Sequence, residues 1–538
     1  MNINKFIVLL IALLPFGAIA FQKPNSVAIQ TDKTVYVSGE TVRFKCTRIQ
    51  TETKDNPVLY VDLCGEGYML ENCLYQSANN HWQGEIAIPD SVQTGVYLLR
   101  CYYGNQHGQL SIGALLLPVV NRFGNNEVNN QRKSNNKAQV FNPFAIDTSN
   151  TGSILKLQSS TTHFAPNSTV KIDIESPYKK WHGGLAMSVF KIDTGLISNQ
   201  SKANIENMYT PHPDIQIYNN LSLSGRITDK RNNKPVNKQM VLLSIPDSVA
   251  NITYAYTDEN GVFSFQIKDQ YNDQNIIVQS IDKKNEFNIS LFPMFLLPPQ
   301  KIPYYVSDDF MNSEETKLAV LRTTLHKAYA GEAQIKHAPR KQTTPFYGLT
   351  DRRIYPEIYI DLDDFNEIAW EILPTLKYRI SRDSTYLRIW DPEKKIFYNQ
   401  PSILVDGVPV FDPATLNILN SKKIKWIEIQ AQTRCYGDIF IDGLVAIQTH
   451  KGDFSEIELP KNAIKSNIRS YSLPYEASNE NKPFFRDVLH WDPYVQPTGG
   501  TISIPFEASA EKGKYLAIVK GFDEQGNLQK AFLTFTIH

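Results

Sequence analysis

Four carboxylates within one short stretch are the residues best suited to chemistry: Asp361, Asp363, Asp364 and Glu367. A pair of such carboxylates could supply the general acid and the nucleophile of a glycoside hydrolase. The run Asp-Phe-Asn-Glu-Ile around them is instead typical of a helix start, where acidic side chains interact favourably with the helix dipole. Catalysis needs partners that converge from other elements. Because no such partners are evident, we favour the helix-start interpretation.

The histidines indicate no second type of site. Ten are scattered along the chain, and the sequence contains no HExxH, GxSxG, Walker or GxGxxG motif. Isolated histidines such as His450 and His490 are typical of surface or capping positions. No Cys/His cluster has the spacing of metal ligands. The sequence therefore predicts a protein that is not an enzyme and that uses no cofactor or metal.

Five cysteines are present, and four of them lie early in the chain: Cys46, Cys64, Cys73 and Cys101. In an oxidising compartment they permit two disulfides, but their spacing does not fix the pairing. Cys64 and Cys73 flank a short loop, while Cys46 and Cys101 lie in apolar runs typical of strands, so we favour these two pairs. The alternative is that the four are buried free thiols, which behave as small hydrophobic groups.

The first twenty residues have the pattern of a secretory signal peptide. Lys5 precedes the apolar run Phe6–Leu14, and the small-residue ending Ala18-Ile19-Ala20 predicts cleavage before Phe21. The apolar run is too short to span a bilayer, and no lipoprotein cysteine follows it. We expect an exported, periplasmic chain without a membrane anchor of its own.

Length and charge narrow the function further. The 538 residues predict several domains, because single cores rarely grow to that size. With 55 basic and 55 acidic side chains, the net charge is zero. No overall field steers the protein towards nucleic acid or an anionic membrane, so we expect no nucleic-acid partner.

Short alternating strands dominate the first part of the mature chain and predict an immunoglobulin-like β-sandwich over residues 21–121. Within it, Thr31–Val42 resembles the opening of the macroglobulin-like domains of α2-macroglobulins, and Leu98–Tyr103 resembles their later core strand. The GCGEQ thioester motif of those proteins is absent from the sequence. The resemblance therefore does not imply covalent trapping of proteases.

Further domains follow from changes in composition and period. Residues 122–145 are rich in Asn and predict a linker, and residues 146–220 resume the strand pattern and predict a second sandwich. Residues 299–350 predict a helical connector, because Leu318, Leu321, Leu325 and Tyr329 fall at helical spacing. Residues 456–538 predict a C-terminal β domain.

Between the second sandwich and the connector, residues 221–298 resemble a carboxypeptidase-regulatory-like domain. The resemblance rests on Leu223–Asp229 and on Tyr256–Phe265. It implies a small sandwich in which Asp258–Gly261 forms a turn, while Phe263 and Phe265 point into the core. Such domains carry no peptidase site.

Residues 351–455 carry the most specific pattern. A strand ending in Val405-Asp406-Gly407 is followed by the strand Ile424–Gln430, a Tyr436-Gly437 turn and a strand that closes on Thr449–Gly452. This order closely resembles the plug domain of TonB-dependent outer-membrane receptors. Independently of that resemblance, Asp406-Gly407 predicts a tight turn, and Gly437 and Gly452 predict positive φ.

The sequence after Gly452 is far too short for the 22-stranded barrel that follows a receptor plug. We therefore expect a separate outer-membrane β-barrel as partner. The type 9 secretion translocon of Bacteroidota, a large barrel sealed on its periplasmic side by another protein, is one specific version, and an accessory of a nutrient-uptake receptor is another. The alternative from a different class is a macroglobulin-like structural or protease-interacting protein, with residues 121–142 as its bait. The expected fold is mainly β and multidomain, with immunoglobulin-like sandwiches plus an α+β plug-like domain.

Overall fold

A computed structural model places most of the chain. It describes residues 27–49, 57–77, 81–105, 108–142, 153–192, 215, 217–267, 274–281, 286–330, 344–348, 350, 353–359, 361–381, 384–475 and 485–538. The protein is mainly β and multidomain, as the sequence predicts. The predicted signal peptide, residues 1–20, lies outside the described residues.

The N-terminal sandwich consists of two facing sheets, with strand orders β1-β3-β6 and β2-β8-β7-β4-β5. Its strands are β1 (Val27–Thr31), β2 (Tyr36–Val37), β3 (Thr41–Arg48), β4 (Val58–Cys64), β5 (Met69–Gln76), β6 (His81–Ala87), β7 (Gly95–Gly104) and β8 (Leu110–Val120). β7 is buried along its whole length. One of its faces lines the sandwich core, and the other packs on a second cluster that includes Ile302 and Phe310. This double burial explains its nearly continuous apolar sequence.

The predicted linker at residues 122–145 is wrong where the structure describes it. The stretch forms helix α1 (Glu127–Lys133) and strand β9 (Gln139–Val140), and β9 pairs in parallel with β20 (Tyr304–Tyr305). The buried Asn129 side chain donates to the Val306 carbonyl at 3.1 Å and accepts from the Val306 amide at 2.9 Å. Polar residues can thus be fixed by hydrogen bonds, a source of order that a count of apolar residues misses.

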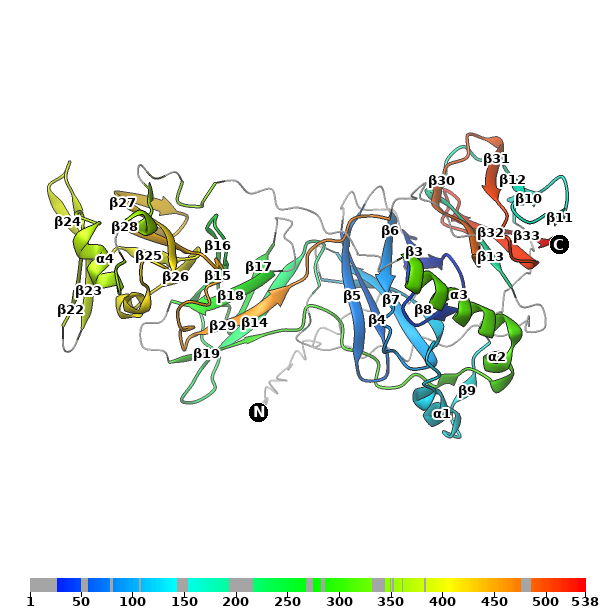
Figure 1. Cartoon of the computed structure of the whole chain (residues 1–538), viewed down its shortest axis with the longest axis horizontal. Coiled ribbons are helices and arrows are strands. Elements are labelled where there is room, and N and C mark those ends of the chain that lie inside the picture. The colour runs from blue at the N-terminus through cyan, green and yellow to red at the C-terminus, as the bar shows by residue number, and fades with distance from the viewer. Residues whose placement is uncertain are drawn as a thin grey trace, which may run out of the picture.

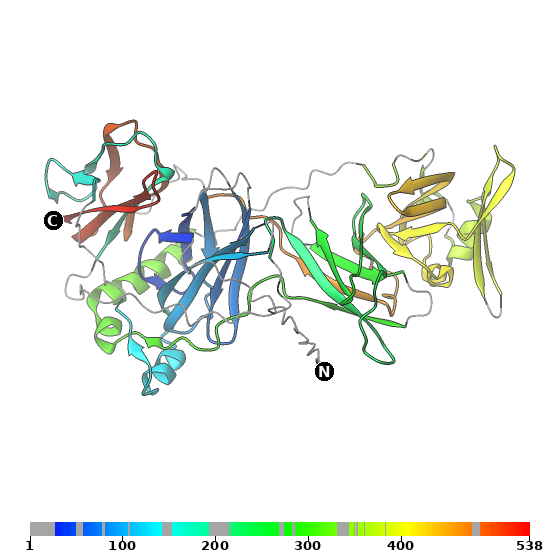
Figure 2. The same ribbon diagram turned by 180° about the vertical axis from the view of Figure 1, so that it is seen from behind.

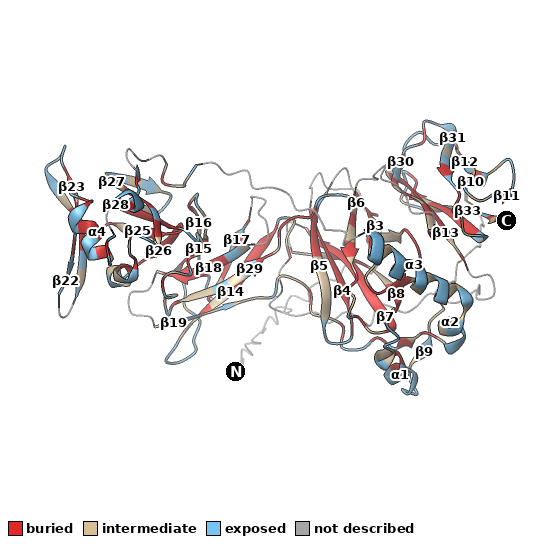
Figure 3. Cartoon of the chain, in the orientation of Figure 1, coloured by how far each residue is buried: buried red, intermediate tan, exposed pale blue. Residues whose placement is uncertain are grey.

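The predicted helical connector contains α2 (Asp308–Asn312) and α3 (Glu314–Ala330). The apolar residues whose spacing predicts α3 do not form its packed face. All four are exposed: Leu318, Leu321, Leu325 and Tyr329. The helix packs instead through a polar side that includes the buried Arg322 and Thr323. Figure 3 shows the outer side of α3 as exposed.

The predicted second sandwich and the predicted C-terminal domain are one structure, which we call the split sandwich. Its sheets have the orders β10-β12-β31 and β11-β33-β32-β13-β30. The strands are β10 (Lys156–Gln158), β11 (His163–Phe164), β12 (Thr169–Ser176), β13 (His182–Lys191), β30 (Val488–Val495), β31 (Gly500–Glu507), β32 (Gly513–Phe522) and β33 (Leu528–Ile537). The boundaries 146–220 and 456–538 are therefore corrected, because neither segment completes a two-sheet core alone.

The middle sandwich corresponds to the carboxypeptidase-regulatory-like prediction. Its sheets, β17-β14-β19 and β16-β15-β18-β29, include a late strand from beyond residue 460, so the boundary 221–298 is too narrow. The Asp258–Gly261 turn is present, and Phe263 and Phe265 are buried as predicted. The strands are β14 (Ser222–Asp229), β15 (Met240–Ile245), β16 (Asn251–Tyr256), β17 (Val262–Gln266), β18 (Gln274–Ser280), β19 (Phe287–Leu291) and β29 (Ala463–Ile468).

The domain predicted at 351–455 has an α+β fold, and we call it the inserted domain. A five-stranded sheet, β21-β27-β28-β25-β26, is joined by a three-stranded sheet, β22-β23-β24. The elements are β21 (Arg353–Ile354), η3 (Pro356–Ile358), α4 (Phe365–Glu371), β22 (Leu376–Ile380), β23 (Thr385–Asp391), β24 (Ile396–Asn399), β25 (Ser402–Val405), β26 (Val408–Val410), η4 (Pro413–Ile418), β27 (Ile424–Tyr436) and β28 (Ile439–Thr449).

The domains are nested along the sequence. The chain leaves the split sandwich after β13 and builds most of the middle sandwich. It then returns to the N-terminal sandwich as β20, α2 and α3 before it forms the inserted domain, and β29 and finally β30–β33 complete the two interrupted sandwiches. Figure 1 shows the inserted domain at one end of an elongated molecule and the split sandwich, with the C-terminus, at the other. Figure 2 shows the same order from behind. None of the helices in the described ranges combines the length and apolar character needed to cross a membrane.

Candidate functional site

The Asp406-Gly407 turn joins β25 to β26 as a two-residue hairpin. Val405 pairs with Val408, and both central residues have positive φ, 49° at Asp406 and 79° at Gly407. Two successive positive φ values are the geometry that favours an Asp-Gly pair in a tight hairpin. The local sequence therefore determines this turn.

The Asp406 carboxylate is hydrogen-bonded to the end of β28 and to the loop that follows it. It is fully buried and accepts four hydrogen bonds: from Gln448 Nε2 at 2.9 Å, from the Thr449 amide and hydroxyl at 2.7 Å each, and from the Phe454 amide at 3.0 Å. Burial raises the pKa of Asp406, while the Thr449 and Phe454 donors oppose that rise. The Gly452 amide donates to the Thr449 hydroxyl, and Gly452 has the expected positive φ of 67°.

The Tyr436-Gly437 turn contacts the middle sandwich directly. The Tyr436 hydroxyl donates to the Ile252 carbonyl at 2.9 Å, and the Asp438 amide donates to the Tyr254 hydroxyl at 3.1 Å. Gly437 has a φ of 58°, and a Cβ added to it would lie 2.0 Å from the Tyr254 hydroxyl oxygen. The glycine is therefore required by a neighbouring domain as well as by its own turn.

An apolar cluster continues this contact between the two domains. It combines middle-sandwich side chains with inserted-domain side chains: Leu242, Ala250 and Ile252 with Leu404, Trp426, Ile441 and Leu444. The Asp247 amide donates to the Asp406 carbonyl at 3.1 Å, and Gln279 Nε2 donates to the Pro409 carbonyl at 3.0 Å. The turns at Asp406-Gly407 and Tyr436-Gly437 are thus used within the chain, where they fasten the inserted domain to the middle sandwich.

The four carboxylates with catalytic potential form a helix start. Asp364 is the N-cap of α4 and accepts from the Glu367 amide at 2.9 Å, while the Glu367 carboxylate accepts from the Asp363 amide at 2.9 Å. This arrangement is a variant of a capping box, in which the Glu367 carboxylate accepts from the residue before the N-cap. Asp361 forms an ion pair with the exposed Lys422 at 2.9 Å. The geometry agrees with the helix-start interpretation.

The predicted disulfide between Cys64 and Cys73 is wrong, because the two side chains lie on opposite faces of one sheet. Cys73 pairs across strands with Val61 and lies in the sandwich core, whereas the Cys64 thiol lies 3.3 Å from Asp62 and 3.4 Å from Arg100 on the other face. Strand alternation places neighbouring side chains on opposite faces. A count of residues in the intervening loop does not reveal this.

Cys46 and Cys101 do meet. They come from the two facing sheets of the N-terminal sandwich, both are buried in its core, and a hydrogen bond joins their thiols. All five cysteines are free thiols in the structure. Burial raises the pKa of the Cys101 thiol well above its usual value. A Cys46–Cys101 disulfide stays a prediction for an oxidising compartment.

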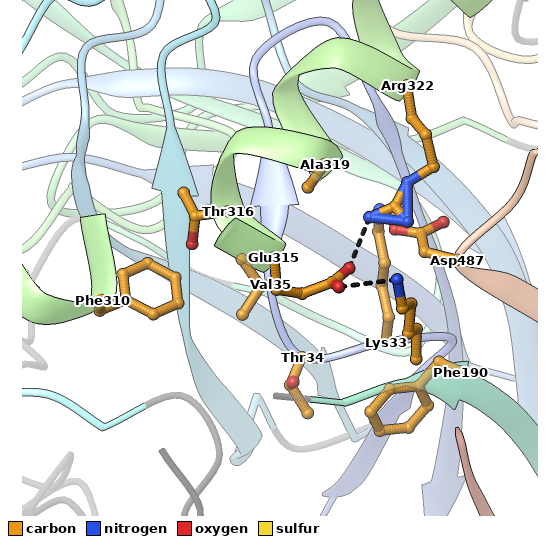
Figure 4. Close-up of a pocket in the computed structure, with 11 residues that line it drawn as sticks. Lys33, Thr34, Val35, Phe190, Phe310, Glu315, Thr316, Ala319, Arg322 and Asp487 are labelled. Atoms are coloured by element: carbon orange, nitrogen blue, oxygen red, sulfur yellow. Dashed lines mark hydrogen bonds and ion pairs between the residues drawn. The ribbon is translucent and has the colours of Figure 1, made fainter. Parts of the chain in front are cut away.

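A buried charged cluster lies where the N-terminal sandwich, the split sandwich and α3 meet (Figure 4). Its ion pairs join residues of four distant segments: Lys33 to Glu40 and Asp487, Lys191 to Glu315 and Glu511, and Arg322 to Glu315 and Glu511. In Figure 4 the labelled Lys33, Glu315, Arg322 and Asp487 converge on one space. No sequence pattern indicates this cluster, because its members are separated by hundreds of residues.

The cluster holds the N-terminal sandwich, the split sandwich and α3 together. The cavity that it lines holds about 40 Å³, which is room for water but far below the ~300 Å³ or more that small-molecule sites need. Burial alone would raise the pKa of Asp487, but Lys33 and Arg322 hold that pKa below its usual value. The carboxylate therefore stays charged and paired across the domain boundary.

A second polar contact joins the same two sandwiches. Lys45 of β3 donates through Nζ to the Gly184 carbonyl at 2.9 Å and lies 5.8 Å from the centre of the Tyr494 ring, which also stacks on His81. Burial lowers the pKa of Lys45 to about 7, against an attraction from Asp492 that raises it. This lysine loses its charge near neutral pH inside an interface.

The histidines singled out by sequence have ordinary surroundings. His450 lies 3.7 Å from Glu357 at the surface, and the His490 ring stacks on Phe506. Across the described residues, no three His, Cys, Asp or Glu side chains gather into a metal-binding group.

Comparisons with known proteins yield only distant structural similarity. The sequence matches no protein-family profile and no curated protein. Among solved structures, the Salmonella α2-macroglobulin reacted with methylamine aligns at 10% identity over 96% of this chain, with a TM-score of 0.15. The trypsin-activated α2-macroglobulin of Escherichia coli aligns at 10% identity over 95%, also with a TM-score of 0.15.

A repeat region of a large adhesion protein aligns over 95% of this chain at 8% identity, again with a TM-score of 0.15. At this level the similarities carry no argument about shared function. The chain spans about a quarter of the two α2-macroglobulins, 24% and 23% of their lengths.

Proposed function

We propose that the chain is an exported, non-catalytic binding protein of a bacterial envelope, and that its inserted domain associates with a separate outer-membrane β-barrel. The order of plug-type motifs between residues 401 and 452 supports the type of partner. The supporting structural observation is the way in which the domain is held. Its Asp406-Gly407 and Tyr436-Gly437 turns face the middle sandwich, which leaves its opposite end exposed at the tip of the molecule.

The nested topology suits a rigid carrier. After β28 the chain returns directly to the middle sandwich, where β29 pairs with β18 over six residues, and before β21 the Phe346 amide donates to the Ala250 carbonyl of that sandwich at 3.0 Å. The split sandwich likewise contributes strands from both sides of the insertion. The β29 connection, the Phe346 hydrogen bond and an apolar interface together limit hinge motion more strongly than one flexible linker alone would. The sandwiches then act as a spacer that presents the inserted domain.

The finer version of this proposal assigns the barrel to the type 9 secretion translocon, with the chain closing its periplasmic side. A nutrient-uptake receptor is the other barrel that the plug-type motifs suggest. The two versions share the same binding end of the chain, and the identity of the recovered barrel separates them.

Affinity purification of the tagged full-length chain from native, gently solubilised membranes tests the proposal. We expect an outer-membrane β-barrel protein to be recovered in near-stoichiometric amount with the tagged chain and to be absent when the chain is untagged. Recovery of the tagged chain with no barrel, before and after chemical crosslinking in cells, would refute the association.

The alternative, a protease-interacting protein with a bait at residues 121–142, receives less support. That stretch is held by α1, by the pairing of β9 with β20 and by the two hydrogen bonds between Asn129 and Val306. A bait must enter a protease cleft in extended form, and these contacts oppose that. Rapid limited proteolysis within residues 121–142, with inhibition of the protease, would favour the alternative.

A further inference from the structure

We propose that the outer face of the three-stranded sheet β22-β23-β24 is a docking surface for an acidic polypeptide segment of a partner protein. We call it the cationic face and define it by six residues: Lys377, Arg379, Tyr386, Arg388, Trp390 and Phe397. The inference rests on the proposed function, because it takes the inserted domain as the binding end of the chain. It adds the location and chemistry of the contact.

The strand alternation separates two faces of this sheet. Leu376, Leu387, Ile389 and Tyr398 are buried in the core of the inserted domain. Between them, the register aligns Lys377 with Arg388 and Arg388 with Asn399, while Trp390 pairs with Phe397 on the same side. The second set points away from the core. No other domain covers it in Figure 1 or Figure 2, where the sheet forms the tip of the molecule.

The charge of this face is strongly asymmetric. Its three charged side chains, Lys377, Arg379 and Arg388, are all basic, whereas the whole chain is neutral. The acid Asp391 at the end of β23 is buried and accepts hydrogen bonds from the Glu393 and Lys394 amides of the β23–β24 turn. Within the described residues, no carboxylate forms an ion pair with Lys377, Arg379 or Arg388. Three cations are thus available to an acidic partner.

The aromatic residues decide between a protein and a polysaccharide partner. The Lys377 ammonium lies 4.7 Å from the centre of the Phe397 ring, and the Arg388 guanidinium lies 5.2 Å from that of Tyr386. Trp390 and Phe397 contact each other at 4.8 Å between ring centres. Cations already cover one face each of Phe397 and Tyr386, the ring faces on which a sugar would stack. The surface therefore offers a partner positive charge rather than open aromatic faces. Trp, Tyr and Arg together are also the residues that dominate protein–protein contacts.

Binding of a fluorescent peptide of ten glutamates to the full-length chain tests this surface, with fluorescence anisotropy as the readout. We expect saturable binding that weakens as salt rises, because exposed charges are screened. The double variant Arg379→Glu and Arg388→Glu should bind at least about tenfold more weakly. The variant Trp390→Ala should bind the peptide several-fold more weakly. A purely electrostatic surface would show no such loss of affinity.

The matched control is the double variant Lys171→Glu and Lys514→Glu. It makes the same change in net charge at two exposed strand positions of the split sandwich, at the other end of the molecule. We expect it to bind the peptide like the unaltered chain. Circular dichroism and unfolding midpoints would check that all variants fold.

Three results would overturn the docking surface: no binding by the unaltered chain, equal loss in the control, or tighter binding of a sulfated dextran that is insensitive to Trp390. The purification experiment separates this outcome from the proposed function. If the Arg379/Arg388 variant still recovers the barrel, the surface is wrong and the association stands. If no variant recovers a barrel, the association fails, and the peptide titration alone judges the surface.

Discussion

Asp406 and Thr449 are joined twice, because the Thr449 amide and hydroxyl both donate to the Asp406 carboxylate at 2.7 Å. This contact links the β25–β26 turn to the end of β28, and the Phe454 amide extends it to the following loop. One buried side chain therefore organises the part of the inserted domain that adjoins the middle sandwich.

Replacing Asp406 with alanine should destabilise the inserted domain. Four buried donors would lose their acceptor, and each buried donor left unsatisfied costs about 1–3 kcal/mol before relaxation. We expect a loss of roughly 3 kcal/mol in the free energy of unfolding of this domain. Hydrogen exchange should show lost protection at Thr449 and Phe454.

Asp412 provides the control, since it caps η4 at an exposed position by accepting from the Ala414 amide. Asp412→Ala should cost only about 1 kcal/mol. Equal loss of protection in both variants would contradict the central role of Asp406.

Gly437→Ala should loosen the contact between the inserted domain and the middle sandwich. The new Cβ would lie 2.0 Å from the Tyr254 hydroxyl oxygen, so the turn and strand β16 must separate. We expect faster hydrogen exchange in β16 and a broader distribution of maximum dimensions in small-angle scattering.

Gly124→Ala is the control that measures the effect of backbone strain alone. Gly124 also has positive φ, 80°, but a Cβ there would meet nothing within 4 Å. Gly124→Ala should lower the free energy of unfolding because alanine is strained at positive φ. It should leave the contact between the inserted domain and the middle sandwich unchanged. Restored β16 protection in the double variant Gly437→Ala, Tyr254→Ala would identify the clash as the cause, and unchanged exchange in Gly437→Ala would contradict it.

Local patterns predicted local structure well in this chain. The Asp406-Gly407 hairpin, the start of α4 at Asp364 and the core positions of Phe263 and Phe265 all follow from the types of neighbouring residues. Each is determined by steric or hydrogen-bonding preferences that act over a few residues.

Long-range assembly could not be predicted in the same way. β12 pairs with β31 more than 300 residues away in sequence, and the Lys33–Asp487 ion pair spans 454 residues. The sequence of a strand does not indicate which distant strand it pairs with. The split sandwich was therefore predicted as two separate domains. The Cys64–Cys73 prediction failed for a related reason, because sequence proximity does not determine which face of a sheet a side chain occupies.

The cysteines give a direct chemical prediction. Under an oxidant, peptide mapping without reduction should find a Cys46–Cys101 link and no Cys64–Cys73 link, because only the first pair has thiols in contact. Alkylation of the reduced chain should modify the exposed Cys435 first. Cys64→Ser should leave the Cys46–Cys101 link unchanged, whereas a Cys64–Cys73 peptide in the folded chain would contradict the strand register.

Lys45 should make the stability of the two joined sandwiches depend on pH. Burial lowers its folded pKa to about 7, whereas in the unfolded chain it titrates near 10.4. Between these values the unfolded chain binds a proton that the folded chain does not, so the free energy of unfolding rises with pH in this window and its contribution is flat below it. His81, His182, Tyr494 and Asp492 surround the same interface.

Comparison with Lys45→Met isolates the lysine from these neighbours. Between pH 7 and pH 9, the unaltered chain should gain up to about 2 kcal/mol more in the free energy of unfolding than the variant does. Chemical denaturation at the two pH values measures the difference. Lys171→Met, at an exposed position of β12, should leave the pH dependence as it is. Identical slopes for the unaltered chain and Lys45→Met would show that Lys45 keeps an ordinary pKa in the folded protein.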